Sequence, residues 1–276
     1  MIKHENFKLE KLSYIKIGCN VRNFIEVENE KDLLYTMKMK NPKLLGAMSN
    51  ILFAGDEYDS TFISLRGEFL SIKRINETDV RVGAGVRLFT LLGFLADQGL
   101  SGLEEIVGIP GSMGGILFMN AGANGKSISD VLLEFDTVEK KSVNKDECQF
   151  SYRHSGIESP IEFMTFRFKK SNFLNVKAKM SEFLKKRNSA QPSDMPSLGC
   201  VFKNPSPDNP AWKLIDSVGM RSKCINDLCV SSKHSNFIVN TGKGKAKDFL
   251  YLSEEIKKRV KEKYNINLEY EIEILF

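Results

Sequence analysis

Short apolar runs separated by polar turns fill the N-terminal part of the chain. Residues 23–27 form one such run, and Pro42 ends the helical pattern that follows it from about Lys31 to Lys40. Other runs of strand length lie at residues 51–53, 62–65, 69–72, 80–82, 131–135 and 163–168. The pattern therefore predicts a β-α-β opening that continues into a strand-rich section.

Helical spacing of apolar residues marks two further segments. Four leucines between residues 88 and 95 recur on one helical face, and Gly99 suits the position just past the end of that helix. A second amphipathic helix is predicted near residues 176–187. It leads to residues 191–197, a polar, proline-broken link that is the best candidate for a domain boundary.

The chain after this link has a different pattern. A strand that ends in a turn is predicted at residues 198–205, and Pro210 suits the first turn of a helix that Gly219 ends. Two strands, a long helix and an alternating strand are predicted at residues 228–231, 236–240, 249–260 and 268–275. The alternation puts three acids on one face of the last strand: Glu269, Glu271 and Glu273.

Glycines are densest at residues 108–125, with six at positions 108, 111, 114, 115, 122 and 125. Glycine lets bare backbone approach a ligand, and a run of unshielded N–H groups can bind a phosphate. The apolar residues 116–119 are predicted as a short buried strand that anchors this loop, and residues 120–125 as a turn. A turn-rich loop between two core strands is the alternative reading.

Two more small-residue turns occur at residues 45–50 and 83–85. Neither the G-x-G-x-x-G fingerprint nor the G-x-x-x-x-G-K-[ST] loop is present. Three separate backbone loops could instead hold one long diphosphate cofactor, although by themselves they are weak evidence for dinucleotide binding.

Composition and charge narrow the class of protein. With 42% hydrophobic and 27% charged residues, the 276-residue chain has the balance of an ordinary globular protein and the length for two or three subdomains. No apolar run approaches the roughly 18 residues that span a bilayer, and no targeting segment is evident, so a cytoplasmic location is expected. The net charge of +5 is mild, and its lysines are interleaved with acids, which favours a solvated helix over nucleic-acid binding.

The cysteines and histidines predict neither a disulfide framework nor a metal site. Cysteine is odd in number and lacks C-x-x-C spacing, with residues at positions 19, 148, 200, 224 and 229. The histidines are too scattered to form a ligand cluster, at positions 4, 154 and 234.

Taken in order, the motifs resemble the UDP-N-acetylenolpyruvoylglucosamine reductase (MurB) family, from about Ser13 to Ile274. The matching pieces are residues 45–50, 83–85, 99–104, 108–125, 150–155, 199–205, 231–240 and 268–272. The resemblance implies an α+β fold, an FAD-binding module of the vanillyl-alcohol-oxidase (PCMH) type with a smaller α+β substrate-binding domain. The short interval between Ser155 and Gly199 resembles the compact subtype of the family.

The resemblance also implies a division of the chain. Residues 1–190 are expected to form the FAD-binding region, with subdomains at about 1–70 and 71–190. Residues 191–276 are expected to form the substrate-binding domain, and its C-terminal strand, 268–275, is expected to return to the active site.

The activity implied by this resemblance is that of a UDP-N-acetylmuramate dehydrogenase. NADPH, as co-substrate, would reduce non-covalent FAD, and the flavin would reduce UDP-N-acetylglucosamine enolpyruvate to UDP-N-acetylmuramate in peptidoglycan precursor synthesis. The expected partners are the UDP-sugar and NADPH, with no nucleic acid, membrane or obligate protein partner.

Residue roles carried over from the family fall into three groups. The catalytic residues are Arg153 at the substrate carboxylate, Cys200 as proton donor and Glu271 as the acid facing Arg153. The cofactor-binding residues are Gly46, Ala47, Met48, Ser49, Asn50, Gly83, Gly85, Gly108, Ile109, Pro110, Gly111, Ser112, Gly114, Gly115, Asn120 and Gly122. The substrate-binding residues are Tyr152, Lys203 and Asn204, and no metal ligand is implied.

Each catalytic residue also has a plainer reading. Arg153 could be a surface ion-pair partner, Cys200 a small buried hydrophobe, and Glu271 one of three solvent-facing acids. The chain departs from the family at Cys200, where serine is usual, and at Met48, where glycine is usual. A related flavin oxidase and a degenerate nucleotide-binding homologue are therefore the alternative functions.

Overall fold

The computed structural model describes all 276 residues, and the chain separates into two compact units. The first unit comprises residues 1–6, 22–47 and 59–187, and the second comprises residues 7–21, 48–58 and 188–276. Each unit encloses an apolar core of its own.

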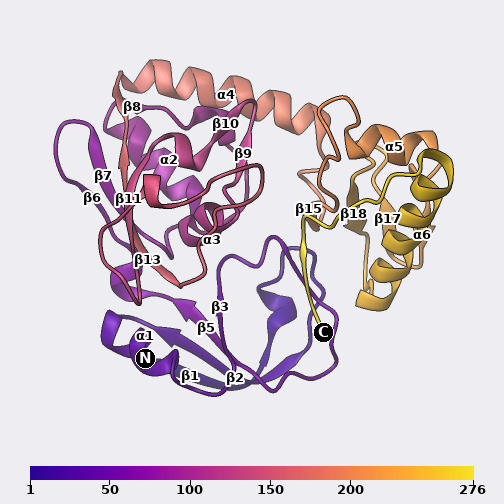
Figure 1. The fold of residues 1–276 in the computed structure, drawn as a ribbon, viewed down its shortest axis with the longest axis horizontal. Helices are drawn as coiled ribbons and strands as arrows, with labels where there is room; N and C mark the ends of the chain where they lie inside the picture. Colours follow the sequence, from indigo (N-terminus) through magenta and orange to yellow (C-terminus); the bar gives the residue numbers. More distant parts are fainter. The chain divides into compact units, whose positions relative to one another are not determined.

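A sheet with three parallel strands opens the first unit (Figure 1). Its order is β1-β2-β5-β3, with β1 at Ile2–Lys8, β2 at Asn20–Val27, β5 at Thr61–Leu65 and β3 at Pro42–Leu45. Strand β5 pairs in parallel with both β2 and β3, and helix α1, Glu30–Thr36, connects β2 to β3. The Asn29 side chain begins α1 by accepting a hydrogen bond from the Asp32 N–H. The predicted β-α-β opening is confirmed, although α1 ends before Lys40.

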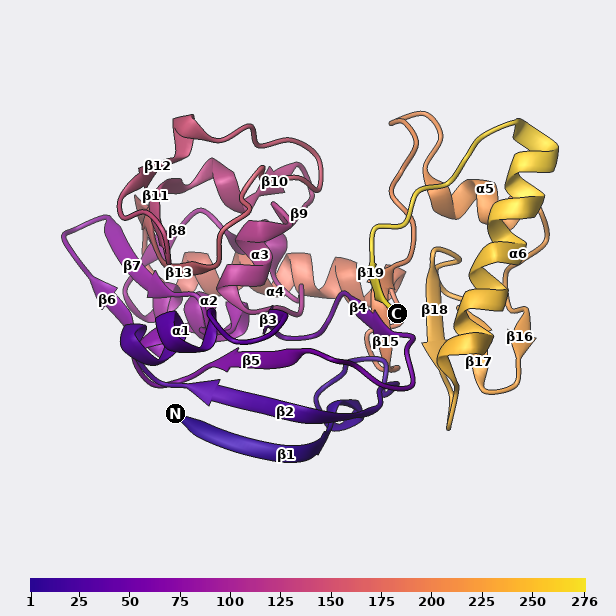
Figure 2. The same ribbon diagram turned by 60° about the horizontal axis from the view of Figure 1, so that its bottom comes forward.

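An antiparallel sheet is the second sheet of the first unit. Its order is β12-β11-β13-β7-β6, with β12 at Val143–Asn144, β11 at Leu132–Thr137, β13 at Ile161–Arg167, β7 at Asp79–Gly83 and β6 at Ile72–Arg74. Helix α2, Leu88–Asp97, buries all four leucines of its predicted face, and Gly99 follows it with a φ of +62°. The short helix α3, Met113–Phe118, packs against β7 and β13 (Figures 1 and 2).

Shorter elements complete the first unit. Strand β8, Leu100–Ser101, pairs with β14, Lys169–Lys170, and β9, Gly122–Ala123, pairs with β10, Lys126–Ser127. The amphipathic helix predicted near residues 176–187 is confirmed as α4, Phe173–Ala190. Short 3-10 helices occur along the chain at Leu9–Lys11, Gly67–Leu70, Glu104–Ile106, Ile128–Asp130 and Lys145–Glu147.

The second unit is built on an antiparallel sheet of order β15-β18-β17-β16. These strands are Ser197–Cys200, Phe237–Asn240, Leu228–Val230 and Cys224–Ile225, in that order. Helix α5 spans Ala211–Ser217, and the long helix α6, Ala246–Tyr264, packs on β16 and β17 (Figure 2). A separate parallel pair joins β19, Glu273–Leu275, to β4, Ile51–Phe53.

Residues from the N-terminal part of the chain contribute to the second core. Ile15, Ile17 and Leu52 are buried in the same apolar cluster as Phe202 and Leu268. This packing explains why residues 7–21 and 48–58 group with the second unit. The family resemblance implied one boundary at residue 190, whereas these two segments lie before it and group with the second unit. The assignment of FAD binding to residues 1–190 and of substrate binding to residues 191–276 stays a prediction.

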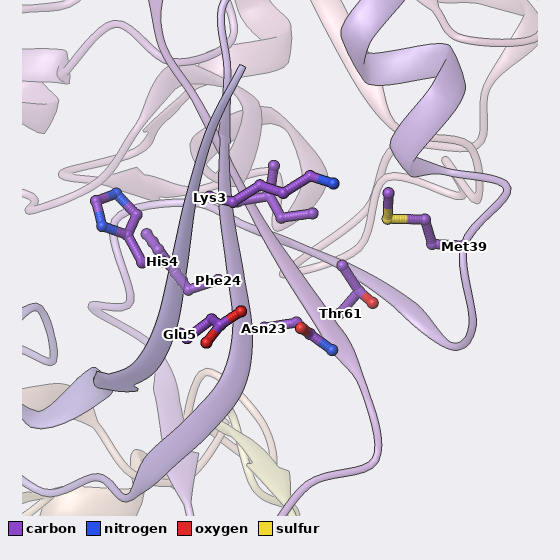
Figure 3. A pocket seen from close by; sticks show the side chains of 8 residues that line it. Lys3, His4, Glu5, Asn23, Phe24, Met39 and Thr61 are labelled. Atoms are coloured by element: carbon purple, nitrogen blue, oxygen red, sulfur yellow. The ribbon is translucent and has the colours of Figure 1, made fainter.

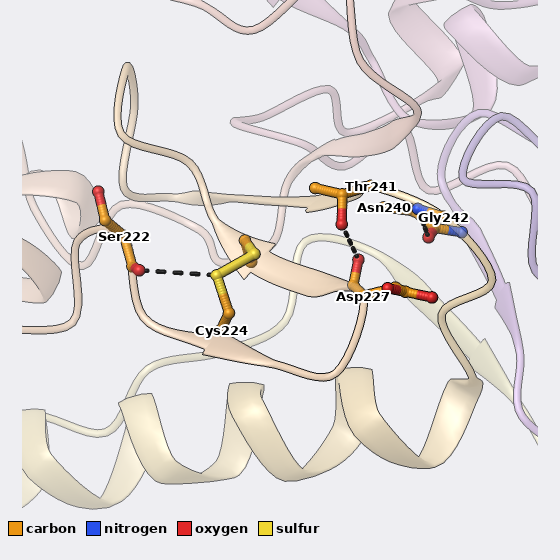
Figure 4. The surroundings of a disulfide bond; sticks show 7 residues. Ser222, Cys224, Asp227, Asn240, Thr241 and Gly242 are labelled. Atoms are coloured by element: carbon orange, nitrogen blue, oxygen red, sulfur yellow. Dashed lines mark hydrogen bonds between the residues drawn. A yellow bond between two sulfur atoms is a disulfide. The ribbon is translucent and has the colours of Figure 1, made fainter.

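A disulfide between Cys224 and Cys229 corrects the expectation that the cysteines form no bridge (Figure 4). The two cysteines are paired positions in the β16–β17 hairpin. Its turn, Asn226-Asp227, is held to the end of β18 because the Thr241 hydroxyl and N–H both donate to the Asp227 carbonyl. The informative signal in the sequence was two cysteines flanking a turn by equal distances. Cys19, Cys148 and Cys200 are not in disulfides.

Three segments predicted as strands have other conformations. Residues 116–119 lie in and just after α3, because the loop before them caps a helix. Residues 67–70 form a 3-10 helix, so β6 begins only at Ile72. The chain bends at Glu271 and Ile272, so the alternation predicted for residues 268–275 persists as a strand only in β19.

None of the helices is long and apolar enough to cross a membrane.

Candidate active site

The loop at residues 108–125 is built around α3. Ser112 caps the start of this helix, since its side-chain oxygen accepts a hydrogen bond from the Gly115 N–H at 3.4 Å. At the other end Asn120 has a φ of +42°, and the N–H groups of Asn120 and Ala121 donate back to carbonyls inside α3. This is a Schellman cap, which favours glycine or asparagine at the left-handed position.

Two backbone N–H groups of this loop are available to a ligand. Those of Gly111 and Ser112 donate to no protein acceptor, whereas the Gly114 N–H donates to the Ala84 carbonyl at 2.9 Å. A Cβ on Gly111 would meet only the flexible end of the Ile116 side chain. Consecutive unshielded N–H groups form a concavity suited to a phosphate. The residues present therefore fit a diphosphate cofactor.

Gly83 and Gly85 have structural reasons for being glycine. Their N–H groups donate to the carbonyls of Ser71 and Phe69, and a Cβ on Gly83 would lie 2.2 Å from the Phe69 carbonyl oxygen. Gly122 is similarly constrained, because its Cβ would lie 2.5 Å from the Lys126 carbonyl oxygen. Cofactor contacts from these three glycines stay a prediction.

The turn at residues 46–50 contains one glycine, Gly46, and a methionine, Met48, with a positive φ. A Cβ on Gly46 would lie 2.7 Å from the Ser112 hydroxyl, so Gly46 allows two predicted cofactor segments of the first unit to approach closely. Met48, in the second unit, has a φ of +53° and is 3% exposed. It therefore takes the left-handed backbone conformation that glycine favours, and its side chain is buried.

Arg153 lies in a tight turn of the first unit. The N–H groups of Ser151 and His154 each donate to the other's carbonyl, at 3.0 and 3.2 Å. Arg153 has a φ of +57°, which is uncommon for a long side chain and is found where the surroundings fix the backbone. Its guanidinium lies 4.9 Å from the centre of the Tyr152 ring, which is 51% exposed. The turn thus presents an arginine and an aromatic ring together.

Cys200 ends β15 in the second unit, after Gly199 with a φ of +78°. The backbone that follows is held by Asn236, which is 2% exposed. The Asn236 side chain accepts from the Phe202 N–H at 3.0 Å and donates to the Phe202 carbonyl at 2.8 Å. The Asn236 carbonyl also accepts from the Val201 N–H. The thiol is therefore carried on a rigid segment.

Glu271 lies on the segment that pairs with residues 201 and 202. Its N–H donates to the Val201 carbonyl at 2.8 Å, and the rings of Phe202 and Tyr270 stack with centroids 5.2 Å apart. Among the three acids of residues 268–275, Glu271 is half-buried, whereas Glu269 and Glu273 are exposed. The bend at Glu271 explains why this carboxylate differs from its neighbours.

Two predicted substrate-binding residues, Lys203 and Asn204, continue the Cys200 segment. The Lys203 ammonium lies 3.5 Å from the Glu269 carboxylate, an exposed ion pair. The Asn204 side chain accepts a hydrogen bond from the Ala211 N–H at the start of α5. Asn204 thus has a structural role, and its contact with substrate stays a prediction.

The predicted residues collect in two groups, one in each unit. The first unit holds Arg153, Tyr152, Gly46, Ala47 and the predicted residues between Gly83 and Gly122. The second unit holds Cys200, Lys203, Asn204, Glu271 and the predicted residues Met48, Ser49 and Asn50. A hollow of about 150 Å³ beside β1 and β2 in the first unit is lined by none of them (Figure 3).

Sequence reasoning missed Asn236 and Ser155, which support predicted site residues. The Ser155 hydroxyl is buried and donates to the Phe118 carbonyl at 2.7 Å, which ties the Arg153 turn to α3. An asparagine at the start of an apolar strand is the signal that could have identified Asn236. Ser155 had no such signal.

Comparisons with known proteins agree with this geometry. Residues 22–142 match the family model of an FAD binding domain, and residues 191–275 match the C-terminal domain of UDP-N-acetylenolpyruvoylglucosamine reductase. The reductase of Carboxydothermus hydrogenoformans is 36% identical, over 98% of this chain and 93% of the relative. That of Thermotoga maritima is 35% identical, over 96% of this chain and 97% of the relative.

A solved structure extends the likeness to the fold. The crystal structure of UDP-N-acetylenolpyruvylglucosamine reductase (MurB) from Thermus caldophilus covers the whole of both chains, with a TM-score of 0.87 and 31% sequence identity. The α+β fold, with an FAD-binding module and a second α+β domain, is thereby confirmed. The chain belongs to the UDP-N-acetylenolpyruvoylglucosamine reductase family.

Proposed function

We propose that this chain is a cytoplasmic UDP-N-acetylmuramate dehydrogenase, an NADPH-driven flavoprotein that acts on the CH-CH group of UDP-N-acetylglucosamine enolpyruvate. The observation that carries the proposal is the likeness to curated reductases along nearly the full length of both chains. The product would be UDP-N-acetylmuramate, a precursor of peptidoglycan. Proteins of this family are FAD-dependent oxidoreductases.

Backbone groups of the chain are proposed to hold FAD without a covalent bond. The free N–H groups of Gly111 and Ser112 would bind its diphosphate, and Gly46 would allow the first turn to approach. Residues 45–53 and 108–125 contain no histidine or cysteine that could tether a flavin. When bound, FAD would supply the hydride-transfer chemistry that links NADPH to the enolpyruvyl double bond.

Arg153 is proposed to bind the substrate carboxylate. Addition of a hydride to one carbon of the double bond places negative charge on the carbon beside the carboxylate. A fixed guanidinium stabilises that charge better than a mobile one, since it needs no reorientation during the reaction. The tight Ser151–His154 turn and the left-handed backbone of Arg153 support such a fixed position.

Cys200 is proposed to supply the proton that completes the reduction. The S–H bond breaks as a C–H bond forms at the carbon beside the carboxylate, and the thiolate then recovers a proton from water. A cysteine thiol carries an S–H proton that it can donate as a general acid. The Asn236 hydrogen bonds that fix residues 201 and 202 support this role.

Glu271 is proposed to be the acid that faces Arg153 at the place where the substrate carboxylate binds. Its partial burial and its place opposite Val201 distinguish it from Glu269, which pairs with Lys203. We propose further that Tyr152, Lys203 and Asn204 contact the UDP-sugar.

Purified protein tests the proposal. It should be yellow, release FAD on acid precipitation, and oxidise NADPH only when the enolpyruvyl sugar is present, giving a product two mass units heavier than the substrate. A bound flavin that NADPH does not reduce, in a protein that consumes oxygen in place of NADPH, would indicate a related flavin oxidase. Colourless protein that does not take up added FAD would indicate a degenerate homologue.

A further inference from the structure

Asn120 links the predicted cofactor loop to the turn that carries Arg153. Its side-chain amide donates to the Ser151 carbonyl at 2.8 Å. The residue is 6% exposed, and its left-handed φ of +42° is set by the cap of α3. A displacement of the end of α3 would therefore move Ser151 and the turn that holds Arg153.

Asn50 makes the equivalent link in the second unit. Its side-chain amide donates to the Glu271 carbonyl at 3.0 Å, and its own carbonyl accepts from the Glu273 N–H at 2.9 Å. These two bonds bracket the bend at Glu271 and Ile272. The side-chain amide of this loop asparagine is thus engaged with the segment of the predicted acid.

We propose that Asn50 and Asn120 are positioning residues. Asn120 fixes the turn that carries Arg153, and Asn50 fixes the segment that carries Glu271, each against the predicted cofactor loop of its own unit. This inference rests on the proposed function, because it takes Arg153 and Glu271 as the residues to be placed. It gives the asparagine side chains a role other than the cofactor contact predicted from the family resemblance. In each unit one side-chain hydrogen bond joins the predicted cofactor loop to the segment that carries the residue to be placed.

Isosteric variants separate this role from general stability. Asn120→Asp and Asn50→Asp keep side-chain size but remove the amide donor, and aspartate tolerates the left-handed backbone needed at position 120. Asn124→Asp is a matched control. Asn124 lies in the same loop with a φ of +52°, and its amide donates to the Glu105 carbonyl at 2.8 Å, away from the Arg153 turn.

Hydrogen exchange of the FAD-loaded proteins, followed by mass spectrometry, is the decisive measurement. Asn120→Asp should speed exchange about tenfold in peptides covering residues 151–155 and not in those covering 268–275, as expected for loss of one hydrogen bond. Asn50→Asp should do the reverse. Asn124→Asp should change neither segment. Unchanged exchange at residues 151–155 in Asn120→Asp and at 268–275 in Asn50→Asp would overturn the inference.

Substrate affinity supplies a second, independent readout. The Kd for the enolpyruvyl sugar should rise about tenfold in both variants and stay unchanged in Asn124→Asp. Loss of bound FAD from either variant would overturn the inference. It would indicate that the asparagine in question contacts the cofactor directly. A wild-type enzyme that holds FAD but does not reduce the sugar would contradict the proposed function instead, and the exchange data would still decide the roles of the asparagines.

Discussion

The backbone N–H of Glu271 donates to the carbonyl of Val201 at 2.8 Å, so the predicted acid lies on the segment beside that of Cys200. Stacking of Phe202 on Tyr270 continues this pairing by one residue. The bend at Glu271 leaves its carboxylate half-buried, while Glu269 and Glu273 are exposed. The structure therefore gives a physical reason for choosing among three acids that look equivalent in the sequence.

Glu271→Gln should slow reoxidation of the reduced flavin by the enolpyruvyl sugar roughly a hundredfold, the usual scale for a positioned catalytic group. Glutamine keeps the side-chain size, so the backbone bond to Val201 should persist. Single-turnover absorbance measurements would follow the flavin directly.

Glu269→Gln and Glu273→Gln are the matched controls. Their exposed carboxylates should contribute little, because solvent screens them. If all three variants slow the step equally, the overall charge of the segment and not one placed carboxylate is responsible.

Gly111→Ala and Gly114→Ala should have different consequences. A Cβ on Gly111 would lie 2.7 Å from the end of the Ile116 side chain and meet no backbone atom, so this variant should bind FAD more weakly and lose less stability than Gly114→Ala. A Cβ on Gly114 would lie 2.9 Å from that of Ala84, so that variant should unfold at a lower temperature as well. Thermal melts and fluorescence titration with FAD distinguish the two effects.

Gly93→Ala controls for the substitution itself. It lies in α2 with open space around its Cβ, so its Tm should not fall. Wild-type FAD affinity in Gly111→Ala would mean that the loop is only a turn.

Asp79 provides a test of stability against pH. Two hydrogen bonds from Arg167, at 2.8 Å each, together with bonds from Asn76 and Thr78, outweigh burial and hold the pKa of Asp79 well below its ordinary value. A depressed folded pKa stabilises the protein above the unfolded pKa of about 3.9, and this stabilisation is lost as pH falls below it. Asp79→Asn should therefore lower the Tm by several degrees at pH 7 and by progressively less below about pH 4.

The exposed pair of Glu77 and Lys170 is the comparison for this test. Glu77→Gln should leave the Tm unchanged at both pH values, because both groups are solvated. A Tm difference for Asp79→Asn that stays constant down to pH 3 would exclude the ionised carboxylate as its cause.

Periodicity predicted the elements whose burial follows a regular pattern. The leucines of α2 and the apolar face of α6, from Phe249 to Val260, are buried as their spacing requires. In the motif at residues 199–205, Gly199 takes a left-handed conformation just before Cys200, and the catalytic role of this segment stays a prediction.

The failures came where local caps or distant partners decide the conformation. The apolar residues 116–119 fit a strand or a helix equally well, and the caps at Ser112 and Asn120 decide for a helix. The bend in residues 268–275 depends on Asn50, more than two hundred residues away in the sequence. The alternation of residues 268–275 carries no information about so distant a partner, so it predicted a straight strand.

Cys200 carries the central claim, because it is the proposed proton donor. Stopped-flow absorbance should separate the two half-reactions of Cys200→Ala and Cys200→Ser. NADPH should reduce the flavin of both variants at the wild-type rate, since that step uses no donor to the sugar. Reoxidation by the enolpyruvyl sugar should nearly cease in Cys200→Ala and recover substantially in Cys200→Ser, whose hydroxyl can deliver a proton from the same place. Reoxidation of Cys200→Ala at the wild-type rate would contradict the account and leave Cys200 as a packing residue.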